Sequence, residues 1–112
     1  MNIVTLIGRL TKDPDLRTTT NQTSVCSFTV AVDRKFKDAN GQRQADFINC
    51  VAWKGTAEFV QKYFQKGHKI ALIGSIQTRS YEKDGVKHSI TEVIVDEVEF
   101  VEKAAPKDDF EL

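Results

Sequence analysis

Four aromatic side chains fall outside the apolar rows that could form a core, and cationic residues surround them. The aromatic residues are Phe36, Phe47, Trp53 and Tyr81. The interleaved cations are Arg34, Lys35, Lys37, Arg43, Lys54, Arg79, Lys83 and Lys87. A flat ring stacks on any nucleic-acid base, for about 1–3 kcal/mol per base, while cations meet the phosphates. The pattern therefore favours single strands over duplexes, whose readout needs a helix or ribbon with base-edge donors.

The stretch Ala45–Trp53, with the sequence ADFINCVAW, is the predicted strand that carries two of these rings. Successive residues of a strand point to opposite faces of the sheet. One face carries Phe47, Asn49, Val51 and Trp53. The other carries the small or aliphatic residues Ile48, Cys50 and Ala52. We expect the second face to be the core face, although a strand buried on both faces, or with its faces reversed, also fits this segment taken alone.

The other segments predict further strands and one helix. Strand patterns cover 2–10, 25–34, 69–82 and 86–101, and a short polar strand lies within 16–24. Hairpin turns are expected at Asn40-Gly41 and at Lys83-Asp84-Gly85. Thr56 is expected to cap a helix that runs to about Lys66 and is closed by Gly67. The inward row of strand 69–82 is expected to contain Ile70, Leu72, Gly74 and Ile76, and an irregularity is expected near Glu97.

This order of elements predicts an all-β fold, a small antiparallel β-barrel with one helix closing one end. A five-stranded OB-fold with extended hairpins has this order, and an open α+β sheet is the alternative. Residues 1–102 are expected to form one domain, followed by a short, acidic, flexible tail at 103–112.

Charge is distributed unevenly along a chain whose formal net charge is zero. Through Thr91 there are 14 Lys and Arg against 8 Asp and Glu, a balance of +6. From Glu92 onward there are 2 against 8, a balance of −6. This distribution suits a body that meets a polyanion and a tail that does not, although uneven surface charge is also common in small domains.

Catalysis has little support in the sequence. Asp13 and Asp15 could be paired carboxylates, but turn chemistry around Pro14 explains them better. His68 follows the predicted helix and His88 flanks a strand, without a Ser/His/Asp order, a metal-binding cluster or a phosphate-binding glycine loop. We therefore expect no enzymatic activity, no cofactor and no metal site.

The two cysteines and the apolar runs bear on the compartment. Cys26 and Cys50 lie within strand patterns and lack a metal or redox spacing, so reduced, buried thiols of a cytoplasmic protein are expected, with a disulfide between them as the alternative. No run approaches the roughly 20 apolar residues of a membrane span. The N-terminus has the pattern of a strand rather than of a signal peptide, and no membrane association is expected.

Several blocks, in order, resemble the bacterial-type single-stranded DNA-binding proteins, an OB-fold family that includes phage and plasmid members. The resembling blocks are the strand Asn2–Leu10, DPDLR at Asp13–Arg17, FINCVAW at Phe47–Trp53, AEFVQKYFQKG at Ala57–Gly67, IGSIQTRSYEKDG at Ile73–Gly85 and TEVIVDEVEF at Thr91–Phe100. The resemblance covers about residues 1–102. It implies base stacking on Phe36, Phe47, Trp53 and Tyr81, with the neighbouring Lys and Arg on phosphates.

The resemblance also implies a homotetramer that coats single-stranded DNA in the cytoplasm, associated with the nucleoid, in replication, recombination, repair or DNA uptake. Longer members end in an acidic tip with a terminal Pro-Phe that recruits replication and recombination proteins. Here Asp108, Asp109 and Phe110 are similar to that tip, but the terminal Pro-Phe is missing, which leaves partner recruitment open.

Three alternatives stay open from the sequence. The chain could be an OB-fold RNA-binding or ribosome-associated protein, since a fold does not determine its ligand. It could be a small nuclease or other enzyme on the same barrel. It could also be an assembly protein whose aromatic residues lie between subunits.

Overall fold

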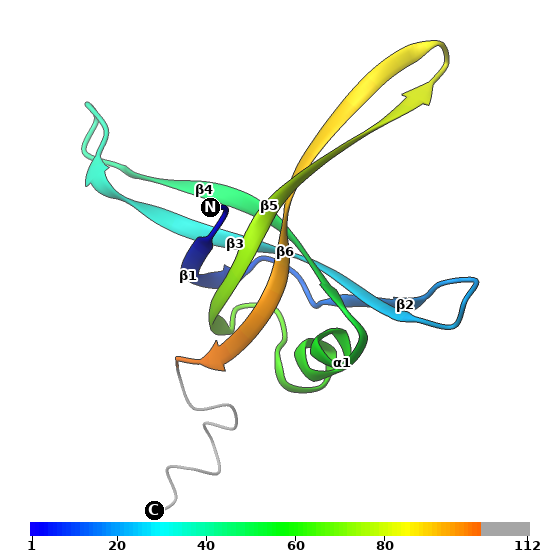
Figure 1. The fold of residues 1–112 in the computed structure, drawn as a ribbon. Helices are drawn as coiled ribbons and strands as arrows, with labels where there is room; N and C mark the ends of the chain where they lie inside the picture. Colours follow the sequence, from blue (N-terminus) through cyan, green and yellow to red (C-terminus); the bar gives the residue numbers. More distant parts are fainter. Residues whose placement is uncertain (102–112) are drawn as a thin grey trace, which may run out of the picture.

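The computed structural model describes residues 1–101 as six strands and one helix (Figure 1). The elements in order are β1 (Val4–Leu10), β2 (Asp15–Thr18), β3 (Ser24–Lys37), β4 (Arg43–Trp53), α1 (Lys54–Tyr63), β5 (Lys69–Lys83) and β6 (Val86–Phe100). No helix in this part of the chain has the length and apolarity needed to cross a membrane.

Five of the strands close into a barrel, which confirms the predicted OB-type fold. The sheet order is β1-β5-β6-β4-β3, and β1 returns to β3 through the pairs Arg9↔Ala31 and Leu10↔Val30. β2 pairs with β3 outside this ring. The expectation of a wholly antiparallel barrel is wrong at one place, because β4 and β6 pair in parallel at Cys50↔Val93 and Val51↔Ile94. The chain passes through α1 and β5 between these two strands, so β6 runs in the same direction as β4.

The core contains the residues that alternation assigns to the inner face. Cys50 and Ala52 on β4 are buried, as are Phe28 and Val30 on β3, so the face assignment of Ala45–Trp53 is confirmed. Ile48 is partly buried and packs against the same cluster. The core is therefore built from alternate residues of half-buried strands, and the intervening residues form the outer face.

The helix α1 covers one end of the core (Figure 1). Ala57, Val60 and Phe64 form the predicted apolar stripe and all three are buried. The predicted start is wrong, because α1 begins at Lys54 without a side-chain cap and Thr56 lies inside it. Lys54 has a positive φ of 55°, which turns the chain from β4 directly into the helix. α1 ends at Tyr63 rather than near Lys66.

Two hairpins extend well beyond the barrel, formed by β3–β4 and by β5–β6 (Figure 1). The β5–β6 turn at Asp84-Gly85 was predicted, and both residues have positive φ, as a two-residue hairpin turn requires. Ile76 was expected to face the core but is exposed, because it lies beyond Gly74, the last residue of β5 that pairs with β1. The irregularity expected near Glu97 is confirmed, since the register changes from Ile73↔Glu97 to Gly74↔Val95.

Gly74 permits a close approach between β5 and β6. A Cβ atom there would collide with the carbonyl oxygen of Ile94. We expect Gly74→Ala to lower the free energy of unfolding by about 1–3 kcal/mol in urea denaturation, because backbone must move to relieve the overlap. The matched control is Gly55→Ala in α1, where an added Cβ meets nothing within 4 Å. A Gly74→Ala protein as stable as the unmodified chain would contradict this account of the barrel.

The two cysteines are free, buried thiols, as expected. Burial raises the pKa of Cys26 from an ordinary 9.0 to about 11, with a smaller contribution from Asp15, and raises the pKa of Cys50 to about 12. The unfolded chain therefore loses these protons first. The thiols leave stability unchanged below about pH 9 and lower it as the pH rises from there, toward about 11 for Cys26 and about 12 for Cys50.

This titration predicts slow thiol chemistry in the folded protein. At about pH 8 we expect negligible reaction with a disulfide reagent such as dithionitrobenzoate until guanidinium unfolds the chain. In the folded protein the cysteines are protonated, and the reagent cannot reach the buried sulfur atoms. Urea denaturation of a Cys26→Ala, Cys50→Ala variant should show a weaker loss of stability above pH 9 than the unmodified chain. Rapid modification of the folded protein would contradict the buried placement.

Candidate functional site

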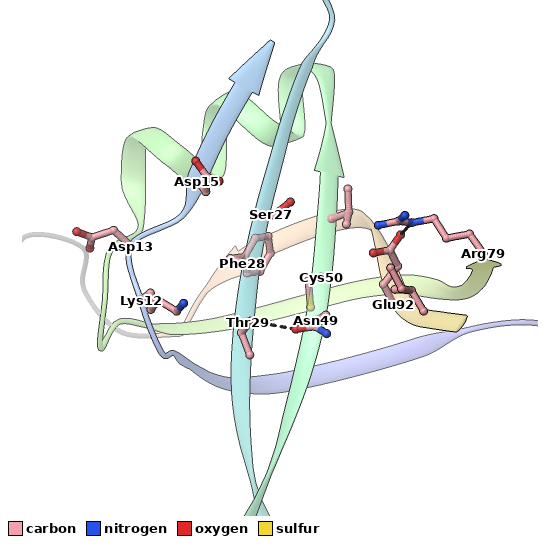
Figure 2. Close-up of a pocket in the computed structure, with 12 residues that line it drawn as sticks. Lys12, Asp13, Asp15, Ser27, Phe28, Thr29, Asn49, Cys50, Arg79 and Glu92 are labelled. Carbon is pink, nitrogen blue, oxygen red and sulfur yellow. Dashed lines mark hydrogen bonds and ion pairs between the residues drawn. The ribbon is translucent and has the colours of Figure 1, made fainter. Parts of the chain in front are cut away.

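A groove of about 410 Å³ crosses the outer face of β3 and β4. Outward side chains of the two strands form its floor, and these are Ser27, Thr29, Asn49 and Val51. Figure 2 shows Lys12 and Asp13 beside one edge of this floor, and Arg79 and Glu92 of the β5–β6 hairpin beside the other. The Thr29 hydroxyl donates a hydrogen bond to Asn49 Oδ1 (3.1 Å), which ties β3 to β4 at the centre of the floor.

Phe47 and Trp53 lie on the same face of β4 as this floor. Their side chains alternate with the inward ones, so Phe47, Asn49, Val51 and Trp53 follow one another along the outer surface. The exposed fraction is 66% for Phe47 and 43% for Trp53, which confirms that both rings lie outside the core. Six residues of strand separate them by about 20 Å, so the two rings bracket the groove floor along β4.

Tyr81 and Phe36 lie on the two projecting hairpins. Tyr81 stands two residues beyond Arg79 on β5, on the same face of the hairpin, and is 43% exposed. Phe36 lies near the end of β3, within the irregular stretch of the β3–β4 register between Asp33 and Lys37, and is 81% exposed. All four predicted aromatic residues are therefore accessible, and Phe47, Trp53 and Tyr81 share the outer face of one continuous sheet.

The backbone around Trp53 fixes the position of this ring. Trp53 is the last residue of β4, where it pairs with Val25 of β3. It is also the residue from which α1 starts, and its own backbone is still extended. A strand that passes into a helix without a loop leaves little freedom at this end of the groove.

The loop that follows Phe36 is held by Asp38, which the sequence pattern did not single out. Asp38 Oδ1 accepts hydrogen bonds from the backbone N–H groups of Asn40 and Gln42 (2.9 Å each), and Oδ2 accepts one from the Gln44 amide (2.8 Å). These bonds, that from Gln42 foremost, lower the pKa of Asp38. The Asn40-Gly41 turn predicted here therefore depends on a carboxylate two residues upstream.

The three predicted phosphate-binding arginines already have partners within the protein. Arg34 forms a two-pronged ion pair with Asp46 (2.7 Å), and the hydrogen bonds from Arg34 lower the pKa of Asp46. Arg79 Nε pairs with Glu92 Oε1 (3.0 Å). Arg43 donates to the backbone carbonyl oxygens of Arg34 and Lys35 (2.9 and 3.4 Å). A carboxylate thus partly balances the charge of Arg34 and of Arg79 before any ligand arrives, whereas Arg43 is held by neutral carbonyl groups.

The five predicted lysines differ from the arginines. Lys35, Lys37, Lys54, Lys83 and Lys87 are exposed and form no ion pair with any residue of 1–101. Lys83 shares the face of Tyr81, whereas Lys87 pairs with Glu82 in the register and lies on the opposite face of the hairpin. The structure therefore does not bring all eight predicted cations to one surface.

Several groove residues have no counterpart among the predicted site residues. Asn49 and Val51 were expected on the outer face, and alternation on β3 places Ser27 and Thr29 there as well. Lys12 and Glu92 reach the groove from a turn and from a hairpin strand, and only the folded arrangement brings them together. Periodicity identifies which face of a strand a residue occupies, but it does not identify which other segments flank the groove.

The remaining polar candidates have local structural roles. Asp13 Oδ1 accepts a hydrogen bond from the backbone N–H of Lys66 (2.8 Å), and Asp15 pairs with Arg17 (2.9 Å). His68 Nδ1 accepts a hydrogen bond from the backbone N–H of Gln65 (3.2 Å). In the part of the chain that the structure describes, no group of three or more His, Cys, Asp or Glu side chains could hold a metal ion. The predicted partner-binding residues Asp108, Asp109 and Phe110, and the tail 103–112 as a whole, lie outside the described residues.

Comparison with known proteins yields a match over the whole described region. The model of the single-strand binding protein family matches residues 1–101. Similar proteins include the single-stranded DNA-binding proteins of Bacillus cereus and Bacillus anthracis, each 52% identical over 103 residues, and single-stranded DNA-binding protein 2 of Listeria monocytogenes, 50% identical over 103 residues. Each alignment covers 91% of this chain and, respectively, 61%, 60% and 64% of the relative. The chain thus spans about three fifths of the length of these relatives.

Proposed function

Because this chain belongs to the single-strand binding protein family, we propose that it binds single-stranded DNA with little sequence preference and without catalysis. Bases stack on Phe36, Phe47, Trp53 and Tyr81 in this proposal. The lysines around these rings, Lys35, Lys37, Lys54 and Lys83, meet the phosphates. The observation that carries the proposal is the continuous outer face on which Phe47, Trp53 and Tyr81 are exposed around one groove.

The geometry supports single strands rather than duplexes. A ring that offers its face needs an unpaired base to stack on, and stacking tolerates every base. Base-edge reading in a duplex needs a helix or a ribbon that enters the major groove. Here α1 packs its apolar stripe on the barrel core, and it does not line the groove.

The experiment that tests the proposal compares three labelled ligands of equal length. Fluorescence anisotropy of oligo-dT, of a duplex and of oligo-U should be followed during titration with the protein at matched salt. We expect tight binding of oligo-dT that weakens as salt rises from about 50 to 200 mM, and much weaker binding of the duplex. Stronger binding of oligo-U than of oligo-dT would favour an RNA ligand, and no binding of either single strand would overturn the proposal.

Glu92 is predicted to weaken the interaction with DNA. Its carboxylate is nearly buried in the groove and holds Arg79. Glu92→Gln removes this negative charge and leaves the Arg79 guanidinium to a phosphate, so the affinity for oligo-dT at about 50 mM salt should rise by about 5- to 10-fold. Glu99→Gln, on β6 but outside the groove lining, is the control for net charge. Unchanged or weaker binding by Glu92→Gln would contradict this role of Arg79.

Assembly into a homotetramer is part of the proposal. β1 pairs with β5 from Val4 to Arg9 but with β3 only at Arg9 and Leu10, so within residues 1–101 one edge of its first residues has no strand partner. Ile3, which directly precedes β1, Ile7 on β1 and Ile73 on β5 are exposed. An unpaired edge beside exposed isoleucines is a natural surface for further copies of the chain. Light scattering of the purified protein should give a mass of about four chains, and a monomer would contradict the assembly.

The proposed role is to coat and protect exposed strands in replication, recombination, repair or DNA uptake. This role would place the protein with DNA in the cytoplasm, associated with the nucleoid. Recruitment of replication or recombination proteins through Asp108, Asp109 and Phe110 stays a prediction, which deletion of 103–112 and a pull-down from lysate would test.

A further inference from the structure

Near the tip of the β5–β6 hairpin, the rings of Tyr81 and His88 are stacked on one another. The two residues are direct partners in the antiparallel register. Their ring centroids are 5.1 Å apart and their planes differ by 19°. The sequence pattern places His88 on a strand flank without assigning it a role, and the proposed base-binding site does not use it.

The pair lies on the same face of the hairpin as the groove residues. The adjoining pairs on this face are Arg79↔Ile90 toward the barrel and Lys83↔Val86 toward the turn. Arg79 and Ile90 both line the groove. A DNA strand that leaves the groove along this hairpin would therefore meet the stacked rings first.

His88 restricts the orientations open to Tyr81. Every residue of this hairpin from 76 to 89 is exposed. A tyrosine on an isolated two-stranded ribbon would otherwise exchange between rotamers, and ordering it would weaken binding. The imidazole covers one side of the phenol ring, so a base would add to the other side.

We propose that His88 is a positioning residue for base stacking, which holds the Tyr81 ring in the orientation that a base of single-stranded DNA requires. The inference rests on the proposed function and extends it to a residue of this hairpin. The competing explanation is that the stacked pair only stabilises the hairpin, as cross-strand aromatic pairs do.

The test is a double-mutant cycle read by anisotropy of labelled oligo-dT. Tyr81→Ala should weaken binding by about 5- to 150-fold, the loss of one stacked base. His88→Ala should weaken it by about 2- to 10-fold, the value of an oriented ring pair. His88→Phe should restore binding to within about 2-fold, because a flat ring remains. Val86→Ala, one pair nearer the turn on the same face, is the control and should bind normally.

The cycle separates positioning from the alternatives. If His88 acts through Tyr81, then His88→Ala should have no further effect in the Tyr81→Ala background. An equal loss in both backgrounds would overturn the inference, because it would mean that His88 contacts DNA by itself. Normal binding by His88→Ala, or failure of His88→Phe to restore binding, would overturn it as well.

Failure of the proposed function gives a different result. If the unmodified chain does not bind oligo-dT, the proposed function fails and the inference falls with it. If Trp53→Ala weakens binding while His88→Ala does not, the proposed function stands and only the inference is overturned. Far-UV circular dichroism of each variant should be unchanged, since both residues lie outside the core.

Discussion

Replacing Phe47 and Trp53 together by alanine is expected to weaken the binding of oligo-dT by at least about 30-fold, because two bases lose their stacking partners. Both rings are exposed on the outer face of β4, on either side of the groove floor. The core packs against the opposite face of this strand, so the barrel should remain folded. Anisotropy of labelled oligo-dT measures the affinity, and urea denaturation verifies the fold.

Tyr63→Ala is the matched control for this double variant. Tyr63 is also an exposed aromatic residue, but it lies on α1 in a ring cluster with Phe59 and Phe100. It does not line the groove between the hairpins. Normal affinity is therefore expected for Tyr63→Ala. Equal losses for the two variants would show that exposed aromatic area, rather than this face, determines binding.

Replacing Lys35, Lys37 and Lys83 by glutamine is expected to change the salt dependence of binding. If each ammonium neutralises one phosphate, the slope of log K against log salt becomes shallower by about 2, and the affinity at about 50 mM salt falls by more than about 100-fold. The loss should shrink as salt rises, because the released counterions then contribute less. Binding isotherms at several salt concentrations measure both quantities.

A variant with the same loss of charge on another surface controls for this effect. Lys62 and Lys66 lie on or just after α1, and Lys69 begins β5. Replacing these three by glutamine removes equal net charge away from the groove and the hairpin tips. We expect a nearly normal slope for this variant. Equal slopes for both triple variants would mean that net charge, and not the placement of these lysines, attracts the DNA.

Alternation made the faces of β4 predictable. A strand with one buried face must place small or aliphatic residues on that face, so Cys50 and Ala52 identified the core, and Phe47 and Trp53 followed on the outer face. The same reasoning failed at Ile76, because periodicity cannot show where a long strand leaves the barrel. Periodicity is a property of one strand alone, whereas burial depends on which other elements pack against that strand.

The ion pairs were not predictable from the sequence in the same way. Arg34 and Arg79 were expected to face phosphates, yet each has a carboxylate partner on the neighbouring strand. Those partners depend on the register between strands, and the β3–β4 register contains an irregularity that no local pattern indicates. The stack of Tyr81 on His88 differs in this respect. Once the two-residue turn at Asp84-Gly85 is fixed, counting back along both strands places the two rings opposite each other.

In the proposed complex, Trp53 lies against the bases of bound single-stranded DNA. Trp53 is the only tryptophan in the chain, so its fluorescence reports on this position alone. Titration with oligo-dT should quench the Trp53 fluorescence strongly until the signal saturates. Saturation should require more DNA at about 200 mM salt than at about 50 mM salt. Unchanged fluorescence, together with a single large species in light scattering, would contradict the claim and place the aromatic residues between subunits instead.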